Sequence, residues 1–591
     1  MCGIFAIFGQ SKNLDKYIIE KNISKSFLNF SFRGPDNSNI INFSDNELHF
    51  TIGHHRLKIL DLSNNSNQPI TDKELTMIFN GEIFNFKELN AQYFPNSIYK
   101  SDTLLIFNLI KKIGFEKTVN EIKGQYAIIS FDKKYKKIDC ASDFFNQKPI
   151  YYFQNNEILI LSSNLNSIIE ILKFNKISTK SIHYYSYLNY IPYEMTPYEN
   201  IFKFKRNQYL QFIFKDNQIK KCTKIIQKKK SIIIDKYDDI EVIEEKLTEI
   251  VKKHLNSDVK IAALLSGGID SSLICMLISK ITKDIETYSI NFENENFSEL
   301  EQIKSFSNQI GLKNTAIIPS DNEFNEFFKN SALIFEEPFA DSSAINSYII
   351  SKKISINFKT CITGDGGDEL FYGYSRHQFD YFMRRYPSLF KILRHNKTII
   401  KKFIGNNLHV NKIMNLLKYD QVNNYFISLS PEIDKILSSN LILEDKDFST
   451  NDTFRNQDIN FYLPYDINVK NDRTSMFNSL EMRSPFLYED TFAIAENYNE
   501  KDHINIFSKK RLLKKILDKN NIKYENKKRG FSFDLVKYLK IFSKDYIKHK
   551  YDIINDTKLL DYQKIPYEIT PENVEKIWNR LILSNWIEKN Y

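Results

Sequence analysis

The sequence predicts two domains of different fold class. The first is an α+β domain with a large antiparallel sheet. The second is an α/β domain with a parallel sheet, helices on both faces and a helical C-terminal part. The length of 591 residues exceeds what one hydrophobic core supports, which is roughly 250–300 residues. Strand-like runs separated by polar turns fill residues 1–210. Strict strand–helix alternation follows residue 239 and is typical of a parallel sheet covered by helices.

In residues 1–210, the strand-like runs are rich in β-branched and aromatic residues. Apolar residues at helical spacing predict helices at Leu14–Phe30 and Asp102–Ile113. Residues 211–238 are rich in Lys and Ile with little regular pattern, so we expect a linker there, between domains at 1–210 and 239–591. The strands expected in the first domain are Gly3–Phe8, Leu48–Gly53, Leu75–Phe79, Tyr126–Phe131 and Ile158–Ser162.

The second domain begins with a helical pattern over Asp239–Asn256. Further helices are expected at Ser271–Lys280 and Ser298–Ile310, each between two strand-like runs. The rest of the chain toward the C-terminus reads as mostly helical. The strands expected here are Lys260–Leu265, Glu286–Phe292, Thr315–Pro319 and Lys359–Thr363.

Charge and cysteine content exclude several classes of function. The net charge of +9 is mild for 591 residues, and the densest basic run, Lys228–Lys230, has no interleaved aromatic residues, so we expect no nucleic-acid partner. The five cysteines are odd in number and lack CxxC spacing, which argues against disulfides or zinc and fits a reducing compartment. With no secretory leader and no apolar run of about 18 residues, we expect a cytoplasmic protein without a membrane partner.

The chain begins Met1-Cys2-Gly3, which places a cysteine where removal of Met1 would expose it. Such a residue carries a thiol and an α-amine whose pKa lies near ~7.7–8.0. The amine can then serve as the base for its own nucleophile. The alternative is an ordinary cysteine at the start of a strand.

The loop Ser266–Ser272 reads Ser-Gly-Gly-Ile-Asp-Ser-Ser, follows an expected strand and opens an expected helix. Glycines allow close approach of an anion, and helix-start N–H groups with Ser hydroxyls can hold phosphates. Asp270 can hold Mg²⁺, which prefers oxygen ligands. The Walker A lysine is missing, and the string is typical of the pyrophosphate loop of ATP pyrophosphatases, which cleave ATP to AMP and pyrophosphate. The alternative is a Gly-Ser turn that caps a helix.

A second loop, Thr363–Glu369, reads Thr-Gly-Asp-Gly-Gly-Asp-Glu and also follows an expected strand. It should therefore reach the same carboxyl edge of the sheet as the first loop, where ligands bind in such folds. Acids among glycines suit metal binding or proton transfer. The alternative is a solvated acidic turn.

Together with further motifs, these loops resemble those of glutamine-dependent asparagine synthetases of the B type, over nearly the whole chain. The resemblance implies a class II glutamine amidotransferase domain with the four-layer αββα fold of N-terminal-nucleophile hydrolases. It also implies an α/β PP-loop synthetase domain, similar to adenine nucleotide α-hydrolases, with a helical C-terminal part. The further motifs are Arg33–Asp36, Asn80–Ile83, Glu336–Ser343, Asp472–Met476 and Glu481–Leu487.

In the first domain, the resemblance implies that Cys2 attacks the glutamine amide and forms a thioester, while its own amine shuttles the proton. Asn80 and the Gly81 N–H would form the oxyanion hole. Arg56 would grip the glutamine α-carboxylate, a task that suits a guanidinium. The residues implied around glutamine are Arg56, Asn80, Glu82 and Asp102.

In the second domain, the resemblance implies Mg²⁺ ligands at Asp270 and Asp368. Asp365 stands where the family commonly has Glu, proposed as a base in the amination step. Lys510 resembles the lysine that stabilises the adenylation transition state, although the register against Lys509 and a solvated helix face stay open. The residues implied around ATP are Leu265, Ser266, Gly267, Gly268, Asp270, Ser271, Ser272, Ile290, Thr363 and Gly364.

The implied enzyme is a carbon–nitrogen ligase that uses glutamine, aspartate, ATP and Mg²⁺. ATP would adenylate the aspartate side chain and release pyrophosphate. Ammonia freed at Cys2 would cross an internal tunnel, giving asparagine, AMP and glutamate. The resemblance is compatible with a homodimer.

Two alternatives stay open. Ser142 and Tyr488 replace the Arg and Asp that the family usually has, and Asn146 replaces a Gly. These departures favour a specialised relative, such as one that amidates a sugar uronate in surface-polysaccharide biosynthesis. The other alternative is a non-catalytic or ammonia-only protein, which the intact set of Cys2, Arg56 and Asn80 argues against.

Overall fold

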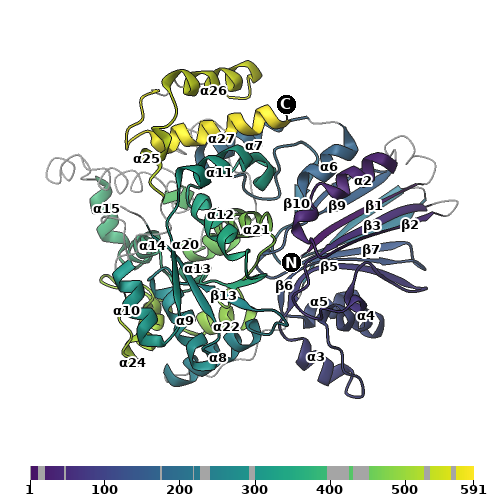
Figure 1. The fold of residues 1–591 in the computed structure, drawn as a ribbon, viewed down its shortest axis with the longest axis horizontal. Coiled ribbons are helices and arrows are strands. Elements are labelled where there is room, and N and C mark those ends of the chain that lie inside the picture. The colour runs from purple at the N-terminus through teal and green to yellow at the C-terminus, as the bar shows by residue number, and fades with distance from the viewer. Residues whose placement is uncertain are drawn as a thin grey trace.

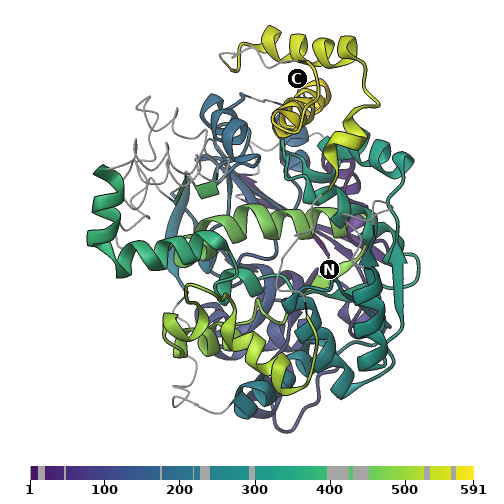
Figure 2. The same ribbon diagram turned by 90° about the vertical axis from the view of Figure 1, so that its left-hand side faces the viewer.

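The structure is a computed structural model. It describes residues 2–10, 20–44, 48–173, 176–216, 218–226, 240–291, 300–395, 425–426, 428–429, 452–524, 533–560 and 567–590. Figure 1 shows two domains side by side, with the N-terminus at the junction between them. The helices α26 (Lys544–Thr557) and α27 (Val574–Asn590) lie together at one end of the molecule, and α27 is seen end-on in Figure 2.

The first domain is built on two six-stranded antiparallel sheets. The first sheet has the order β10 (Ile201–Lys203), β8 (Tyr151–Gln154), β9 (Ile158–Ser162), β1 (Gly3–Gln10), β3 (Leu48–Arg56) and β2 (Asn37–Ser44). The second has the order β12 (Gln218–Ile225), β11 (Gln208–Lys215), β7 (Lys137–Ser142), β6 (Gly124–Asp132), β5 (Leu75–Ile83) and β4 (Ile70–Thr71). This confirms the large antiparallel component that the sequence predicts.

Side chains alternate along the strands and so create two kinds of core. Ile4 and Ala6 of β1 pack between the sheets, whereas Phe5 and Ile7 pack under the outer helices, as the period of two in a strand requires. Helices therefore cover both outer faces and confirm the four-layer αββα fold. The helices are α2 (Glu20–Leu28), α6 (Leu165–Leu172) and α7 (Thr179–Leu188) on the first sheet, and α3 (Phe86–Tyr93), α4 (Asp102–Ile113) and α5 (Phe115–Glu121) on the second.

The predicted linker at 211–238 is wrong in its first part, and the predicted end of the first domain at residue 210 falls too early. Residues Gln208–Lys215 form β11 and Gln218–Ile225 form β12, and the two strands pair with each other and extend the second sheet. The physical reason is that β12 is an edge strand. Edge strands commonly carry lysines that prevent further pairing, and those lysines masked the strand pattern. The first domain therefore extends at least to Ile226, whose side chain packs in its core, and residues 227–238 of the expected linker lie outside the described part.

The second domain contains a five-stranded parallel sheet in the order β15 (Asn314–Ile317), β14 (Glu286–Ile290), β13 (Ile261–Leu264), β16 (Thr360–Ile362) and β17 (Glu481–Arg483). One face packs against α8 (Ile240–His254), α9 (Ile269–Ile281), α10 (Leu300–Ile310) and α24 (Arg511–Lys519). The other face packs against α11 (Asp321–Phe335) and α12 (Ser343–Ile354). The parallel sheet with helices on both faces is as predicted. The fifth strand, β17, was not predicted, because two of its three residues, Glu481 and Arg483, are charged and none is β-branched or aromatic.

The helical C-terminal part is also as predicted. It includes a π-helix, η5 (Asp458–Ile467), between α20 (Phe454–Gln457) and α21 (Asn468–Met476). Among described residues, no helix combines the length and hydropathy needed to cross a membrane. Within the described ranges, the remaining helices are η1 (Ser31–Arg33), η2 (Asn64–Ser66), α13 (Gly367–Leu370), α14 (Ser375–Arg385), α15 (Pro387–His395), α22 (Glu489–Asn497), α23 (Glu500–His503) and α25 (Leu535–Leu539).

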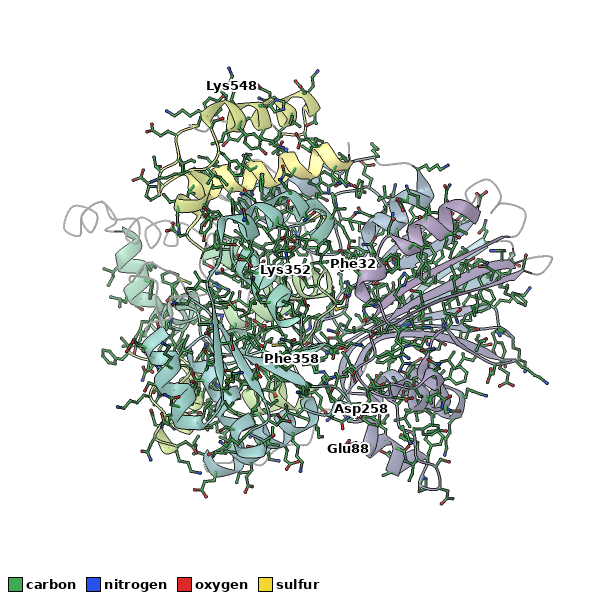
Figure 3. All side chains as sticks on the ribbon, viewed as in Figure 1. Phe32, Glu88, Asp258, Lys352, Phe358 and Lys548 are labelled. Carbon is green, nitrogen blue, oxygen red and sulfur yellow. The ribbon has the colours of Figure 1, made fainter. Side chains whose placement is uncertain are left out.

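Buried ion pairs join the two domains. Arg33 binds both carboxylate oxygens of Asp472, at 2.8 and 2.9 Å. Lys203 binds Glu337 at 2.7 Å. Nearer the surface, Asp258 accepts a hydrogen bond from the Asp61 N–H and lies at the domain boundary in Figure 3. Removing one partner of a buried pair typically costs about 3–5 kcal/mol, because the other charge is then left buried and unpaired.

Candidate functional site

Cys2 lies just before β1, at the junction of the domains, and its side chain is buried. Its backbone nitrogen donates a hydrogen bond to Asn80 Oδ1 at 2.8 Å. Burial raises the pKa of the Cys2 thiol, and the nearby N-terminal charge only partly offsets this. Attack by this sulfur therefore needs a base close by. The nitrogen that Asn80 holds is the atom that would become the α-amine once Met1 is removed.

Asn80 presents a second group beside Cys2. It is fully buried on β5, and its Nδ2 has no hydrogen-bond partner among described residues. The next residue, Gly81, has φ +141°, and a Cβ there would lie 1.9 Å from the Gln125 carbonyl oxygen. Only glycine fits this backbone approach. The arrangement leaves the Asn80 amide available to donate to a developing oxyanion.

Replacing Asn80 by alanine removes that donor, and we expect glutaminase kcat to fall by ~10²–10³ because the oxyanion is stabilised chiefly in the transition state. Glutamate release measures this loss. Synthesis from ammonium salts should be unchanged, since it bypasses Cys2. An equal loss of both activities would instead indicate a structural role for Asn80.

Arg56, at the end of β3, is buried and directed into the loop 60–67. Its Nη1 donates to Ser63 O at 2.7 Å and to Asn67 Oδ1 at 2.8 Å. Its Nη2 donates to the carbonyl oxygens of Leu60 and Asp61. The guanidinium therefore shapes this loop. Its N–H groups already donate to loop oxygens, so a glutamine α-carboxylate would have to share these donors with the loop oxygens or displace them.

Glu82 and Asp102 lie together beneath the end of β5. Asp102 accepts hydrogen bonds from the N–H groups of Ile83 at 3.0 Å and Thr103 at 2.7 Å. Burial raises the pKa of Asp102 to about 6 and that of Glu82 well above its ordinary value, although Arg483 opposes the shift of Glu82. Arg483 reaches Glu82 from the second domain at 3.0 Å. Two buried carboxyls suit an ammonium ligand, which would favour their ionised forms.

This pKa predicts a pH dependence for glutamine use. Above about pH 6, Asp102 is ionised and can pair with an α-ammonium; below it, Asp102 is protonated and cannot. We expect glutaminase kcat/KM, which reports the free enzyme, to fall as pH drops through about 6. Asp102→Asn should lower kcat/KM at pH 8 and remove this inflection. Persistence of the inflection in the variant would assign it to another group.

The phosphate loop lies at the carboxyl edge of the parallel sheet. Ser266 to Ser272 connect β13 to α9, and Ser271 Oγ accepts from the Ser266 N–H at 3.1 Å. The other residues expected around ATP, Leu265, Ile290, Thr363 and Gly364, lie at the carboxyl ends of β13, β14 and β16. All the residues implied for ATP therefore meet at one edge, with the α9 N-terminus favouring an anion.

Lys510 joins the two loops. Its Nζ lies 2.5 Å from Asp270 Oδ2 and 2.5 Å from Asp368 Oδ1. Burial acts to lower the Lys510 pKa, but the two carboxylates raise it above its ordinary value, so the amine stays charged. Lys509 instead reaches Ser375 near the surface, at 3.2 Å. The structure thus places Lys510, and not its neighbour, between the carboxylates.

Two glycines allow this close packing. A Cβ on Gly367 would lie 2.5 Å from Asp270 Cγ, and one on Gly373 would lie 1.8 Å from Asp368 Oδ1. The two carboxylates already share one cation, and paired carboxylates with substrate phosphates are a common Mg²⁺ environment. The donor set of Asp270 and Asp368 therefore fits Mg²⁺. Asp365 lies in the same loop, where its carbonyl accepts from Ser484 Oγ.

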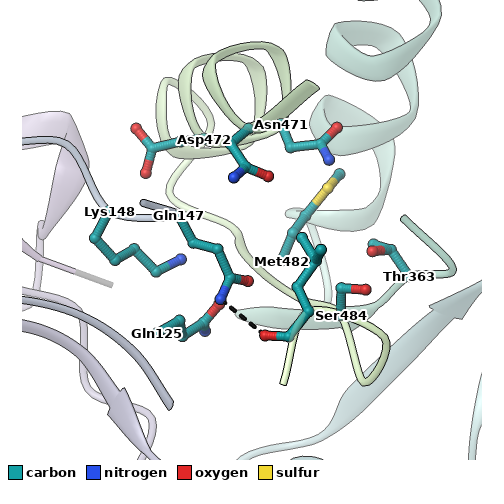
Figure 4. A pocket seen from close by; sticks show the side chains of 10 residues that line it. Gln125, Gln147, Lys148, Thr363, Asn471, Asp472, Met482 and Ser484 are labelled. Carbon is teal, nitrogen blue, oxygen red and sulfur yellow. Dashed lines mark hydrogen bonds between the residues drawn. The ribbon is translucent and has the colours of Figure 1, made fainter. Parts of the chain in front are cut away.

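A cavity lies between the two sites, at the domain interface. Figure 4 shows Gln147 and Lys148 entering it from the first domain and Thr363 and Ser484 from the second. Gln147 Nε2 donates to the Leu487 carbonyl at 3.1 Å across this interface. The cavity has room for a water-sized molecule. Its lining therefore combines Thr363, at the carboxyl edge of the parallel sheet, with residues of the first domain.

Two family models match the chain. Residues 242–588 match asparagine synthase, and residues 1–224 match the glutamine amidotransferase domain. The chain belongs to the asparagine synthase family.

Named relatives agree with this. The chain is 31% identical to a putative glutamine-hydrolysing asparagine synthetase of Methanocaldococcus jannaschii over 426 residues, 68% of this chain and 81% of the relative. It is 25% identical to the glutamine-hydrolysing asparagine synthetase 1 of Bacillus subtilis over 633 residues, which cover 100% of this chain and 98% of the relative. This member of the asparagine synthase family is therefore a glutamine-dependent ligase of the asparagine synthetase type.

Sequence reasoning missed several residues that shape these sites. Arg33 and Asp472 each stood in a motif, but nothing in the sequence paired them. The Arg33 Nε also donates to the Cys2 carbonyl at 3.3 Å, so the pair reaches the nucleophile's backbone. Arg483 stands in the motif Glu481–Leu487, but nothing in the sequence indicated its contact with Glu82. Gly373, which follows the second loop, could have been found as a glycine close to an acidic loop.

Proposed function

We propose that this chain converts aspartate to asparagine with ATP and glutamine, through a β-aspartyl-AMP intermediate. The observation that carries the proposal is the pairing of two sites across one interface. Cys2 and Asn80 supply a nucleophile and an oxyanion donor on one side. Lys510, between Asp270 and Asp368, supplies a cation at a phosphate loop on the other.

In the first half-reaction, the Cys2 sulfur attacks the glutamine side-chain carbonyl carbon. The Cys2 α-amine takes the thiol proton and passes it to the leaving ammonia. The Asn80 Nδ2 donates to the oxyanion, and a thioester forms. Water then attacks the thioester, which releases glutamate and regenerates the thiol.

In the second half-reaction, an oxygen of the aspartate side-chain carboxylate attacks the α-phosphorus of ATP, and pyrophosphate leaves. Lys510 offsets the negative charge that builds on the phosphates. Asp270 and Asp368 would hold Mg²⁺, which neutralises phosphate charge when it is bound. The Ser266–Ser272 loop positions the phosphates with its N–H groups and hydroxyls.

Ammonia then attacks the acyl carbon of β-aspartyl-AMP. The C–O bond to AMP breaks, and a proton passes from nitrogen to a base, for which Asp365 is placed in the acidic loop. Free ammonia protonates readily in water near pH 7, and ammonium is no nucleophile. The cavity lined by Gln147 and Thr363 offers a shielded segment of the route.

The test is incubation of the purified protein with ATP, Mg²⁺, glutamine and aspartate. We expect AMP, asparagine and glutamate in equal amounts. If glucuronate yields AMP while aspartate does not, the acceptor is wrong although the ligase chemistry holds. If ADP forms in place of AMP, the adenylation step is wrong.

A further inference from the structure

Arg483 belongs to the second domain but reaches a carboxyl of the first, and the reaction steps above give it no part. It is fully buried on β17, where its carbonyl oxygen accepts from the Thr363 N–H at 2.9 Å. Its Nη2 lies 3.0 Å from Glu82 Oε1, across the domain interface. The parallel sheet therefore fixes the backbone of Arg483, while its side chain lies against Glu82.

Glu82 lies on the face of β5 that carries the oxyanion donor. Side chains alternate along a strand, so Glu82 shares a face with Asn80 and with Ile78, which packs between the two sheets. On this face, Asn80 accepts a hydrogen bond from the Cys2 nitrogen. The contact from Arg483 therefore ends beside the nucleophile.

Within the described part, the first domain brings two carboxyls here and no side-chain cation in contact with them. Asp102 is held by the neutral N–H groups of Ile83 and Thr103. Burial raises the pKa of Glu82, and Arg483 opposes this rise more than any other group does. The other charges that face Glu82 are Asp102, Glu481 and the N-terminal amine, of which only the amine acts with Arg483.

The shape of the guanidinium suits Arg483 to this place. Its Nε donates to Glu481 Oε1 at 2.6 Å. Its Nη1 donates to the carbonyl oxygens of His254 at 2.9 Å and Asn256 at 2.8 Å. These contacts hold the group so that Nη2 faces Glu82. A lysine has one nitrogen in place of this rigid fork and cannot make all these contacts at once.

We propose that Arg483 is a positioning residue for glutamine, which holds the Glu82 carboxylate in place for the glutamine α-ammonium, so that the second domain completes the glutamine site. The inference rests on the proposed function, because it assumes that glutamine reacts at Cys2. An ammonium group is attracted by an ionised carboxylate and not by a neutral carboxyl. Arg483 acts through Glu82 and touches no reacting atom.

The test compares glutamine with glutaramate, which is glutamine without its α-ammonium group, and measures ammonia release from each. For the unmodified chain, glutamine should exceed glutaramate in kcat/KM by at least about tenfold, the effect of one charged hydrogen bond. Arg483→Lys should lower kcat/KM for glutamine by about tenfold, mainly through KM, because the fork is lost. The value for glutaramate should stay within about twofold. An equal fall for both substrates would overturn the proposal.

A second variant shows whether the effect passes through Glu82. Glu82→Gln nearly keeps the shape of glutamate and should by itself lower the glutamine-to-glutaramate ratio. Adding Arg483→Lys to this variant should lower the ratio no further, since residues that act through one contact are not additive. Glu82→Gln leaves the pair of Arg483 and Glu481 in place, so it tests the proposal even where Arg483→Lys fails to fold. A preserved ratio in Glu82→Gln, or a second full decrease in the double variant, would overturn it.

Lys123→Gln is the matched control. Lys123 forms an ion pair with Asp490 across the same interface, and this pair involves neither Glu82 nor Asp102. Its loss should leave the glutamine-to-glutaramate ratio unchanged. A decrease like that of Arg483→Lys would mean that any weakening of the interface lowers the ratio, which would overturn a specific role for Arg483.

The pH dependence gives a readout that a packing defect would not move. With a poorer cation beside it, Glu82 has a higher pKa and ionises at higher pH. Glutamine use by Arg483→Lys should therefore recover toward that of the unmodified chain as the pH is raised. A constant deficit at every pH would overturn the proposal. If the unmodified chain releases no ammonia from glutamine, the proposed function itself is wrong.

Discussion

Replacing Cys2 by alanine should abolish the use of glutamine while leaving synthesis from ammonium salts intact. The loss should be of order 10⁶ in glutaminase kcat, the scale seen when a nucleophile is removed. The sulfur is the only atom changed, and it lies beside the oxyanion donor of Asn80, whose Oδ1 holds the Cys2 nitrogen at 2.8 Å. Glutamate release and ammonium-dependent AMP release measure the two activities separately.

The two assays on Cys2→Ala also separate chemistry from folding. Cys2 is buried at the domain junction, but alanine removes only the sulfur and should disturb packing little. Retained ammonium-dependent activity therefore serves as the folding control. Loss of both activities would mean that Cys2 is structural.

Replacing Lys510 by alanine should have the reverse effect. We expect AMP and pyrophosphate release to fall by at least ~10²–10³, because a preorganised charge at the transferring phosphate is lost. The Asp270 and Asp368 carboxylates would then face each other without their shared cation, so part of the loss would come from repulsion. Glutaminase activity should survive, since the amidotransferase residues lie in the other domain. Pyrophosphate release at saturating ammonium measures the effect.

Lys509 provides the matched control for this variant. It is the same residue type one position away, and its amine contacts Ser375 near the surface at 3.2 Å. Lys509→Ala should leave pyrophosphate release within about twofold, as expected for a surface substitution. If Lys509→Ala were the damaging change, the placement of Lys510 at the phosphate loop would be wrong.

The sequence predicts elements well where local chemistry defines their ends. Helix α4 begins and ends as predicted, at Asp102 and Ile113, because Ser101 caps its start and Gly114 ends it. The strand Ile158–Ser162 also has its predicted bounds. The π-helix η5 was not predicted, since its hydrogen-bond spacing leaves no recognised apolar period. The strand β12 was missed because its exposed edge is rich in lysine.

The features of the two sites also fall into those that the sequence shows and those that only the fold creates. Their local motifs, such as Ser266–Ser272, are visible in the sequence because one short segment carries several functional groups. The pairings between domains are not visible. Arg33 and Asp472 are 439 positions apart, and Arg483 meets Glu82 only because the domains pack.

The most direct test of the account follows both atoms that the proposed reaction moves. Glutamine labelled with ¹⁵N in its amide is combined with aspartate labelled with ¹⁸O in its side-chain carboxylate, ATP and Mg²⁺. We expect ¹⁵N in the side-chain amide of asparagine and one ¹⁸O in AMP, because the oxygen that attacks phosphorus leaves with AMP. AMP without ¹⁸O, or asparagine without ¹⁵N, would contradict it.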